Sequence, residues 1–513
     1  MKENLILIPL LILISSFILK PVYGLEINEN DLLNDDKTLI LKLDIGKTLH
    51  QKIILPYYLK FASSMYIKSE SGIIQVDPPS AEYTFESSGI YTIIIKFKDY
   101  LTDIKMMFNQ AYSIKEINFT YFNTQKVKDM SFLFMSLDKL TKIDFTNFDT
   151  SQVTTMQAFF SGCKSLTSLD LRNFNTKNVR NMGGFFDGCT KLSSVIIDKK
   201  KFITDNVIYF YTMFAHCSFE FDLSNLNTEN GEDFSKMFLG SSMKNLDLSK
   251  LDTSAANTME EMFKDSVYSS LDLSSFNTKM VKSMVRMFEN CVNLKSLDLS
   301  HFKTLRVENF DSMFNGCISL TSLDLTSFNL VKADRLDRMF SNCKSLVNLD
   351  ISTFDTSNVQ YMNSMFKGCT SLTSIDLSHF NTGRVYSFSG MFDSCTSLEK
   401  INLKNFDASN ARYMSNMFIN CHKLTSIDFS TFKSGKNLLF GIDSMFKNCT
   451  SLSFINLSKF NLTQFYSDFH EFYCGEIFTG IKSSGELIYT EGLIPTKIKN
   501  LFPSGWNIII ESN

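Results

Sequence analysis

The chain repeats one pattern of apolar and polar positions about every 26 residues between residues 104 and 470. The pair Met-Phe, or a substitute for it, starts at residues 107, 133, 159, 185, 213, 237, 262, 287, 313, 339, 365, 391, 417 and 445. A unit of this size cannot bury its apolar face alone, so a period this regular predicts stacked units. We therefore expect a solenoid of about 14 turns over residues 104–470.

Each unit divides into two halves with different periodicities. In the stretch SLTSIDLSHF, Ile375 and Leu377 alternate with polar residues, which is typical of a strand with one buried face. In the other half, Thr382 is a candidate helix N-cap, and apolar residues then recur at a spacing of three from Val385 to Met391. The pattern predicts strand, turn and short helix in every unit, an α/β solenoid.

Ten cysteines occupy one position of the unit, four residues after its first residue. They are Cys163, Cys189, Cys217, Cys291, Cys317, Cys343, Cys369, Cys395, Cys421 and Cys449. Equivalent positions on neighbouring strands lie about 4.8 Å apart, whereas the Cβ atoms of a disulfide lie about 3.5–4.5 Å apart with their vectors turned toward each other. A straight row of thiols also cannot surround a zinc ion tetrahedrally. We expect buried free thiols, with Cys474 outside the column as the exception.

Phenylalanine fills two further columns, one in the Met-Phe pair and one at the strand exit, where Phe380 is an example. These columns predict two stacked aromatic spines in the core. A cofactor-binding aromatic box is the alternative to this packing role.

An aspartate column stands at the exposed position of the strand. We select Asp298, Asp324, Asp350 and Asp376 as candidate ligand-face residues, with the neighbouring hydroxyls of Ser374 and Ser378, because these units carry no insertion. Two carboxylates about 4.8 Å apart repel by roughly 3.5 kcal/mol at an effective dielectric constant of 20. Relief is expected from serine hydroxyls, water and spread side chains, from a bound cation such as Ca²⁺, or from a basic ligand.

The unit MFKGCTSLTSIDLSHFNT, with its C-x-x-L-x-x-L-x-L core, resembles the leucine-rich repeat of the BspA-like surface-protein family. The resemblance implies parallel strands on the concave face, short helices on the convex face, and a secreted or surface-displayed recognition protein. The unit at Cys189 departs from the pattern, because it reads VIIDKKKF and has Ile196 where an aspartate is usual. The unit at Cys217 is shorter by two residues, and the units starting at Met107, Leu133, Met237 and Met262 lack the cysteine. These departures predict a kink or an irregular edge between Cys189 and Met262.

The two ends of the chain differ from the repeats. Residues 1–24 combine Lys2, an apolar run and small residues before Gly24, which is typical of a cleaved signal peptide. Residues 25–103 predict a β-rich N-terminal cap with two strands around Gly89, and residues 471–513 a C-terminal cap. Sequons for N-glycosylation occur at Asn118, Asn448, Asn456 and Asn461.

Charge and motifs narrow the function further. The chain has 51 Lys and Arg against 54 Asp and Glu, so it lacks the basic excess that nucleic-acid binding requires. It contains no H-E-x-x-H, C-x-x-C or P-loop motif, so we expect no enzyme and no resident cofactor. We expect a secreted or cell-surface recognition or adhesion protein, without a transmembrane segment in the mature chain, that binds an extracellular protein or glycan through the concave face. A structural surface-coat or scaffold protein is the alternative.

Overall fold

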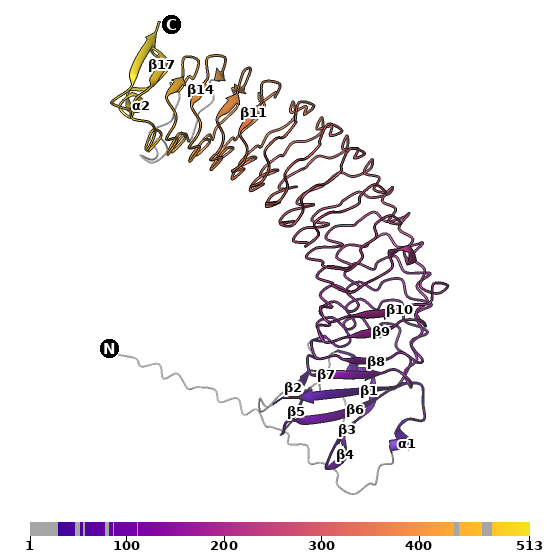
Figure 1. Ribbon diagram of the computed structural model, residues 1–513. Coiled ribbons are helices and arrows are strands. Elements are labelled where there is room, and N and C mark those ends of the chain that lie inside the picture. Colours follow the sequence, from indigo (N-terminus) through magenta and orange to yellow (C-terminus); the bar gives the residue numbers. More distant parts are fainter. Residues whose placement is uncertain are drawn as a thin grey trace, which may run out of the picture.

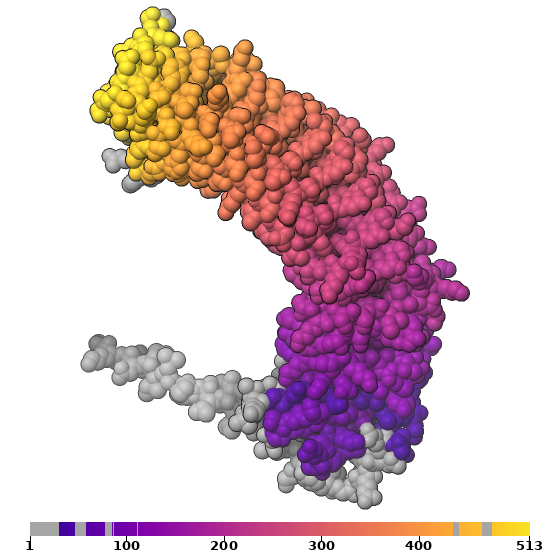
Figure 2. All heavy atoms as spheres, viewed as in Figure 1, coloured from indigo at the N-terminus to yellow at the C-terminus, as the bar shows by residue number. Residues whose placement is uncertain are grey.

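The protein is an arch of stacked turns with a β-sheet at its N-terminal end (Figures 1 and 2). The structure is a computed structural model that describes residues 29–46, 52–54, 57–76, 82–85, 87–109, 111–434, 441–463 and 475–512. The expected signal peptide and Cys474 lie outside the described residues.

The N-terminal sheet runs directly into the repeats. Its elements are α1 (Glu29–Leu32), β1 (Thr38–Ile45), β2 (Lys52–Ile54), η1 (Tyr57–Phe61), β3 (Ala62–Ser69), β4 (Gly72–Val76), β5 (Glu82–Thr84), β6 (Gly89–Phe97), β7 (Ile114–Asn118) and β8 (Lys142–Asp144). The six-stranded sheet has the order β4-β3-β6-β1-β7-β8, and β1 pairs antiparallel with β7, the first strand of the repeats. The two strands expected around Gly89 are β5 and β6, and they belong to different sheets. The predicted domain limits stay predictions.

Parallel strands in register mark the repeats. The remaining elements are β9 (Ser168–Asp170), β10 (Ser194–Ile196), η2 (Leu223–Asn225), β11 (Ser374–Asp376), β12 (Lys400–Asn402), β13 (Asp407–Ala408), β14 (Ser426–Asp428), β15 (Lys433–Ser434), β16 (Phe454–Asn456), β17 (Glu486–Thr490), α2 (Thr496–Lys499) and β18 (Asn507–Glu511). Ile375 of β11 lies opposite Ile401 of β12, one repeat away. Isolated parallel bridges link consecutive units from Asp103 to Gly441. The solenoid of repeated parallel strands is confirmed.

The short helices expected in every unit are wrong. The second half of a unit consists of tight turns, because residues such as Ser364 (φ 54°) and Gly368 (φ 70°) adopt the left-handed conformation, which ends any α-helix. Backbone N–H groups in this half of the unit donate to the following unit, as from Phe366 N to the carbonyl oxygen of Met391 (2.9 Å). The hydrogen bonds of an α-helix would instead stay within the segment. The expected N-cap Thr382 instead accepts the backbone N–H of Asp407 (2.7 Å).

The core consists of columns that run along the arch. Phe340 is fully buried, and its ring stacks on Phe314 at 5.8 Å and on Phe366 at 5.6 Å between centroids. The interplanar angles of these two pairs are 4° and 7°. The aromatic spine of the Met-Phe column is therefore confirmed as a packing feature.

The cysteine column lies beside this spine. All ten cysteines of the column are buried and free, which confirms the expectation. Each thiol donates to the preceding unit, as Cys369 Sγ does to the carbonyl oxygen of Phe340 (3.1 Å). Burial raises the pKa of Cys369 to about 12, so the thiol stays protonated. In the four units without the cysteine, its place is taken by buried Ala111, Leu137, Ser241 and Ser266.

The strands cross the width of the arch. In Figure 1, β7 to β10 run from the inner toward the outer side of the curve, whereas strands lining a concave surface would run perpendicular to the plane of the arch. We name the surface that carries the outward side chains of these strands, and of the equivalent positions in the later units, such as Asp376 of β11, the strand face. It forms a side of the arch and not its hollow, so the expected concave placement is wrong in this part of the chain.

Candidate functional site

The four selected aspartates lie on consecutive turns and are all exposed. We call Asp298, Asp324, Asp350 and Asp376 the acidic column. Each carboxylate accepts the backbone N–H of the residue two positions later. The distances are 2.9 Å from Ser300 to Asp298, 2.9 Å from Thr326 to Asp324, 3.0 Å from Ser352 to Asp350 and 2.8 Å from Ser378 to Asp376. Each side chain therefore fixes the turn that follows its strand position, as Asx turns do.

The same hydrogen bonds keep the acidic column ionised. The backbone N–H of Thr326 and then its hydroxyl lower the pKa of Asp324, although the neighbouring charges of Asp298 and Asp350 act in the opposite direction. The Thr326 hydroxyl lies 2.7 Å from Asp324 Oδ1. A carboxylate that accepts such bonds is stabilised in its charged form. The column is thus a line of negative charges at neutral pH.

The two selected serines take different roles. Ser378 is half-buried, and both its backbone N–H and its side chain lower the pKa of Asp376. Ser374 is exposed at the start of β11. The sequence led us to expect hydroxyl donors here, and we missed the backbone N–H of Ser378, which lowers the pKa of Asp376 more than the hydroxyl does. The signal was present, because Asp-x-Ser or Asp-x-Thr at the end of a strand is a turn signature.

Histidine lies next to the acidic column. His379 Nε2 lies 2.8 Å from the carbonyl oxygen of Ile351 and donates a hydrogen bond to it. When protonated, His379 also lowers the pKa of both Asp350 and Asp376 through its charge, which is a smaller contribution than that of the hydrogen bonds described above. His301 is placed in the same way, with Nε2 2.8 Å from the carbonyl oxygen of Leu273. These rings bridge adjacent turns beside the carboxylates.

The acidic column is linear and does not enclose a cation. Within the described part of the chain, no three His, Cys, Asp or Glu side chains come together in a way that could hold a metal ion. Because Ca²⁺ takes six to eight oxygen ligands, the column would supply only part of its coordination shell. The arrangement is better suited to contact with an extended partner along the arch.

The asparagines of the sequons lie on turns of the solenoid. Asn118, Asn456 and Asn461 each accept, through Oδ1, the backbone N–H of the residue two positions later. Asn448 differs, because its Nδ2 donates to Asn420 Oδ1 (2.9 Å) in the neighbouring unit. Glycosylation at the four sequons stays a prediction. Asn448 is the least favourable acceptor, since its amide nitrogen is already used between turns.

Membrane-spanning helices are not found in the ranges that the structure describes. The helices there have at most five residues, far fewer than a bilayer crossing needs.

Solved structures that resemble the chain include several repeat proteins. A leucine-rich cell-surface protein from Faecalibacterium prausnitzii is 17% identical, with 60% of this chain and 83% of that chain covered and a TM-score of 0.29. A leucine-rich repeat protein from Eubacterium ventriosum is 13% identical, with 67% and 83% covered and a TM-score of 0.29. The functional domain of InlJ from Listeria monocytogenes, which includes a cysteine ladder, is 14% identical, with 74% and 75% covered and a TM-score of 0.20.

Comparison of sequences gives a family. The search of curated proteins found no match. One family model matches the chain four times in overlapping ranges, over residues 102–216, 169–272, 266–374 and 334–460. These ranges together cover residues 102–460, which is most of the repeats and more than half of the sequence. The chain therefore belongs to the family described as "Mycoplasma protein of unknown function, DUF285".

Proposed function

We propose that the protein is a secreted or cell-surface recognition protein that binds an extracellular protein or glycan through the strand face and is not an enzyme. The observation that carries this proposal is the acidic column, four exposed carboxylates on consecutive turns, each held by a backbone N–H. Because these backbone hydrogen bonds already fix the four side chains, contact with a partner costs little conformational freedom.

The chemistry of the column favours a basic partner. Its carboxylates carry charge at neutral pH and follow the direction in which the turns stack, so an extended segment with regularly spaced Lys or Arg side chains complements it. Exposed charges of this kind mainly set specificity and association rate, and salt screens them over about 10 Å at 0.1 M ionic strength. We expect binding to weaken as salt is added.

A double variant tests this proposal. Asp324→Asn with Asp350→Asn removes two charges and keeps the oxygen that accepts the backbone N–H, so the fold is retained and binding of a decalysine peptide weakens at least tenfold. Asp355→Asn is the matched control, since Asp355 is exposed and accepts the N–H of Ser357 (3.0 Å) outside the column. Isothermal titration at two salt concentrations measures both. Equal binding by the double variant and the wild type would count against the column.

One observation favours the coat or scaffold alternative. The last strand, β18, pairs with β17 on one side, and all five of its residues are exposed, including Ile510 at 57%. An apolar edge strand is a template for pairing with a second copy of the chain. Antiparallel pairing of two copies about Ile509 would place Ile508 opposite Ile510 and Asn507 opposite Glu511, without opposed like charges. Light scattering distinguishes the roles, because a coat protein self-associates and Ile509→Lys abolishes the association.

A further inference from the structure

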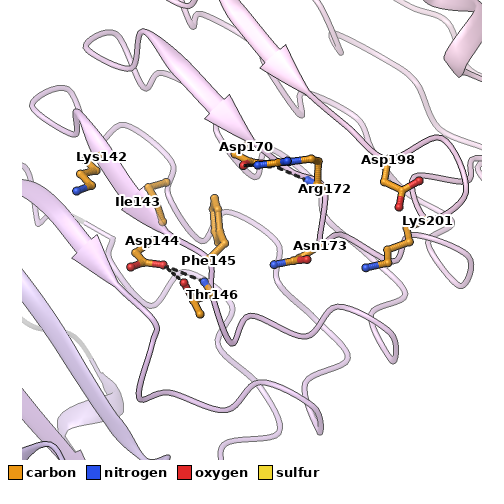
Figure 3. Close-up of a pocket in the computed structure, with 10 residues that line it drawn as sticks. All are labelled: Lys142, Ile143, Asp144, Phe145, Thr146, Asp170, Arg172, Asn173, Asp198 and Lys201. Atoms are coloured by element: carbon orange, nitrogen blue, oxygen red, sulfur yellow. Dashed lines mark hydrogen bonds and ion pairs between the residues drawn. The ribbon is translucent and has the colours of Figure 1, made fainter.

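A hollow of about 480 Å³ opens on the strand face in units that precede the acidic column along the chain. Figure 3 shows the side chains around it. Ten residues from three consecutive units line it, namely Lys142, Ile143, Asp144, Phe145, Thr146, Asp170, Arg172, Asn173, Asp198 and Lys201. Figure 3 shows the amide of Asn173 and the ammonium group of Lys201 pointing the same way, toward the side of the hollow where the Phe145 ring stands.

The irregular unit at Cys189 supplies two of the residues that line the hollow, Asp198 and Lys201. Its interval to the next unit is 28 residues, and Ile196, 51% exposed, stands where other units carry the aspartate. The added residues form a turn closed by Asp198. Its Oδ1 accepts the N–H of Lys200 (2.9 Å), and its carbonyl oxygen accepts the N–H of Lys201 (2.9 Å). This turn supplies the far wall of the hollow and fixes the backbone of Lys201.

Charge is balanced around the hollow. Lys142, Arg172 and Lys201 are matched by three carboxylates, Asp144, Asp170 and Asp198. Arg172 and Asp170 form an ion pair at 2.6 Å, and Arg172 holds the pKa of Asp170 low through this hydrogen bond. An anion or a cation entering the hollow would meet a like charge for every opposite charge, so neither gains a net attraction.

We propose that this hollow binds a neutral oligosaccharide. Sugar hydroxyls both donate and accept hydrogen bonds, so one ring can satisfy a carboxylate such as Asp198 and a donor such as Lys201 together. The amide of Asn173 offers the same double capacity. Ile143 and Phe145 supply an apolar floor for the C–H face of a sugar ring, and the volume lies within the roughly 300–1,000 Å³ of small-molecule sites.

This inference deepens the proposed extracellular recognition and rests on it for the source of the glycan. The site itself is separate from the acidic column in position and in chemistry, since one is neutral and the other negative. The two can therefore be tested, and can fail, independently.

The test uses the full protein on an array of neutral hexasaccharides of glucose, mannose, galactose and N-acetylglucosamine, beside sialylated and sulfated oligosaccharides. We expect binding to at least one neutral hexasaccharide, measured afterwards by titration calorimetry. Asn173→Ala with Lys201→Ala, two exposed positions, removes two hydrogen-bonding groups and is expected to weaken this binding about tenfold, since each contributes roughly 0.5–1.5 kcal/mol. Circular dichroism checks that the fold is kept.

The control is the double variant of the acidic column, Asp324→Asn with Asp350→Asn, which should bind the same hexasaccharide as the wild type does. Three results would overturn the site: binding of anionic sugars only, neutral binding that the hollow variant leaves unchanged, or no binding to any neutral hexasaccharide at millimolar concentration. Loss of decalysine binding in the column variant alone would leave the column proposal standing in each of these cases.

Discussion

Two stretches of the same solenoid differ in regularity and in what they present to a partner. From Phe288 to Phe418 every neighbouring pair of rings in the Met-Phe spine stacks within 10° of parallel, and each unit has its cysteine. In the irregular stretch between Cys189 and Met262 the spine is disturbed at its first step, where Phe186 and Phe214 are 23° from parallel and Phe219 crosses Phe186 edge to face. The next two ring pairs of the spine stack within 10° again, and serine replaces two cysteines. The regular stretch displays a row of identical charges, and the irregular unit displays a hollow with mixed chemistry.

The comparison separates two ways in which a repeat protein can recognise a partner. Regular turns repeat one exposed side chain at a constant spacing, so they suit an extended partner that repeats its own contacts. A single turn of different length breaks the row and creates a concave site for one compact ligand. The following predictions test whether the two stretches differ as described, and they run from the largest expected effect to the smallest.

Alkali should destabilise the regular stretch before the two turns that carry Ser241 and Ser266 in place of the cysteine. Burial raises the pKa of Cys369 and Cys449 to about 12 and of Cys291 to about 11, from an ordinary value of 9.0. Between pH 9 and 12 the unfolded chain therefore binds fewer protons than the folded chain, and stability falls as pH rises, by about 1.4 kcal/mol per pH unit for each thiol. Limited proteolysis with mass mapping should show cuts between residues 291 and 449 before cuts between 219 and 270. Simultaneous cutting of both stretches would remove the distinction.

Removal of one ring from the regular spine should cost about 3–5 kcal/mol of unfolding free energy, because Phe340→Ala leaves a cavity between two rings held in place by their own stacks. Phe221→Ala in the irregular stretch should cost less, since Phe221 is 8% exposed and meets Phe186 and Phe214 at tilted angles of 52° and 45°, so it is not held between two parallel rings. Urea unfolding followed by circular dichroism compares the two variants. Equal losses would show that the irregular stretch is packed as rigidly as the regular one.

Exchange of thiol and hydroxyl between the stretches should have a moderate effect. Cys369→Ser keeps a donor for the Phe340 carbonyl oxygen but buries a more polar group, with an expected cost of about 1 kcal/mol. Ser241 has a second partner, the hydroxyl of Tyr268 at 3.0 Å, so Ser241→Cys also loses a hydrogen bond. Melting temperatures of both variants, with the exposed substitution Lys404→Ala as control, give the order of the effects.

The smallest effect concerns the carboxylates themselves. Asp324→Asn should leave the melting temperature at pH 7 nearly unchanged, because the amide oxygen still accepts the Thr326 N–H, as Asn402 accepts the N–H of Lys404 (3.1 Å). Asp324→Ala should lower it. Since the folded pKa of Asp324 lies below 3.8, its charge adds stability above that value, and this stability is lost as pH falls further. The Asn variant should therefore be less sensitive than the wild type between pH 5 and pH 3.

The sequence allowed the solenoid, the buried thiols and the exposed aspartates to be predicted, because each follows from a position repeated many times. It did not allow the tight turns to be predicted. Apolar residues spaced by three, as at Val385 and Phe388, fit a helix equally well, and only left-handed residues such as Ser364 exclude it. The hollow was also missed, although VIIDKKKF and its 28-residue interval marked the place. A departure from a repeat shows where geometry changes, but not which side chains then face one another.

The thiol column has a consequence for how the chain is made. A contact such as that of Cys369 with Phe340 spans about one unit, so a turn can close as soon as the next unit is available. If the chain is exported, as we propose, it meets oxidants while it is still incomplete, and every turn that has not closed exposes a thiol able to form a wrong disulfide. Closure proceeding from the N-terminal sheet, one turn at a time, would keep few thiols reactive at any moment. Folding in this order would then limit the formation of wrong disulfides between the cysteines of the column.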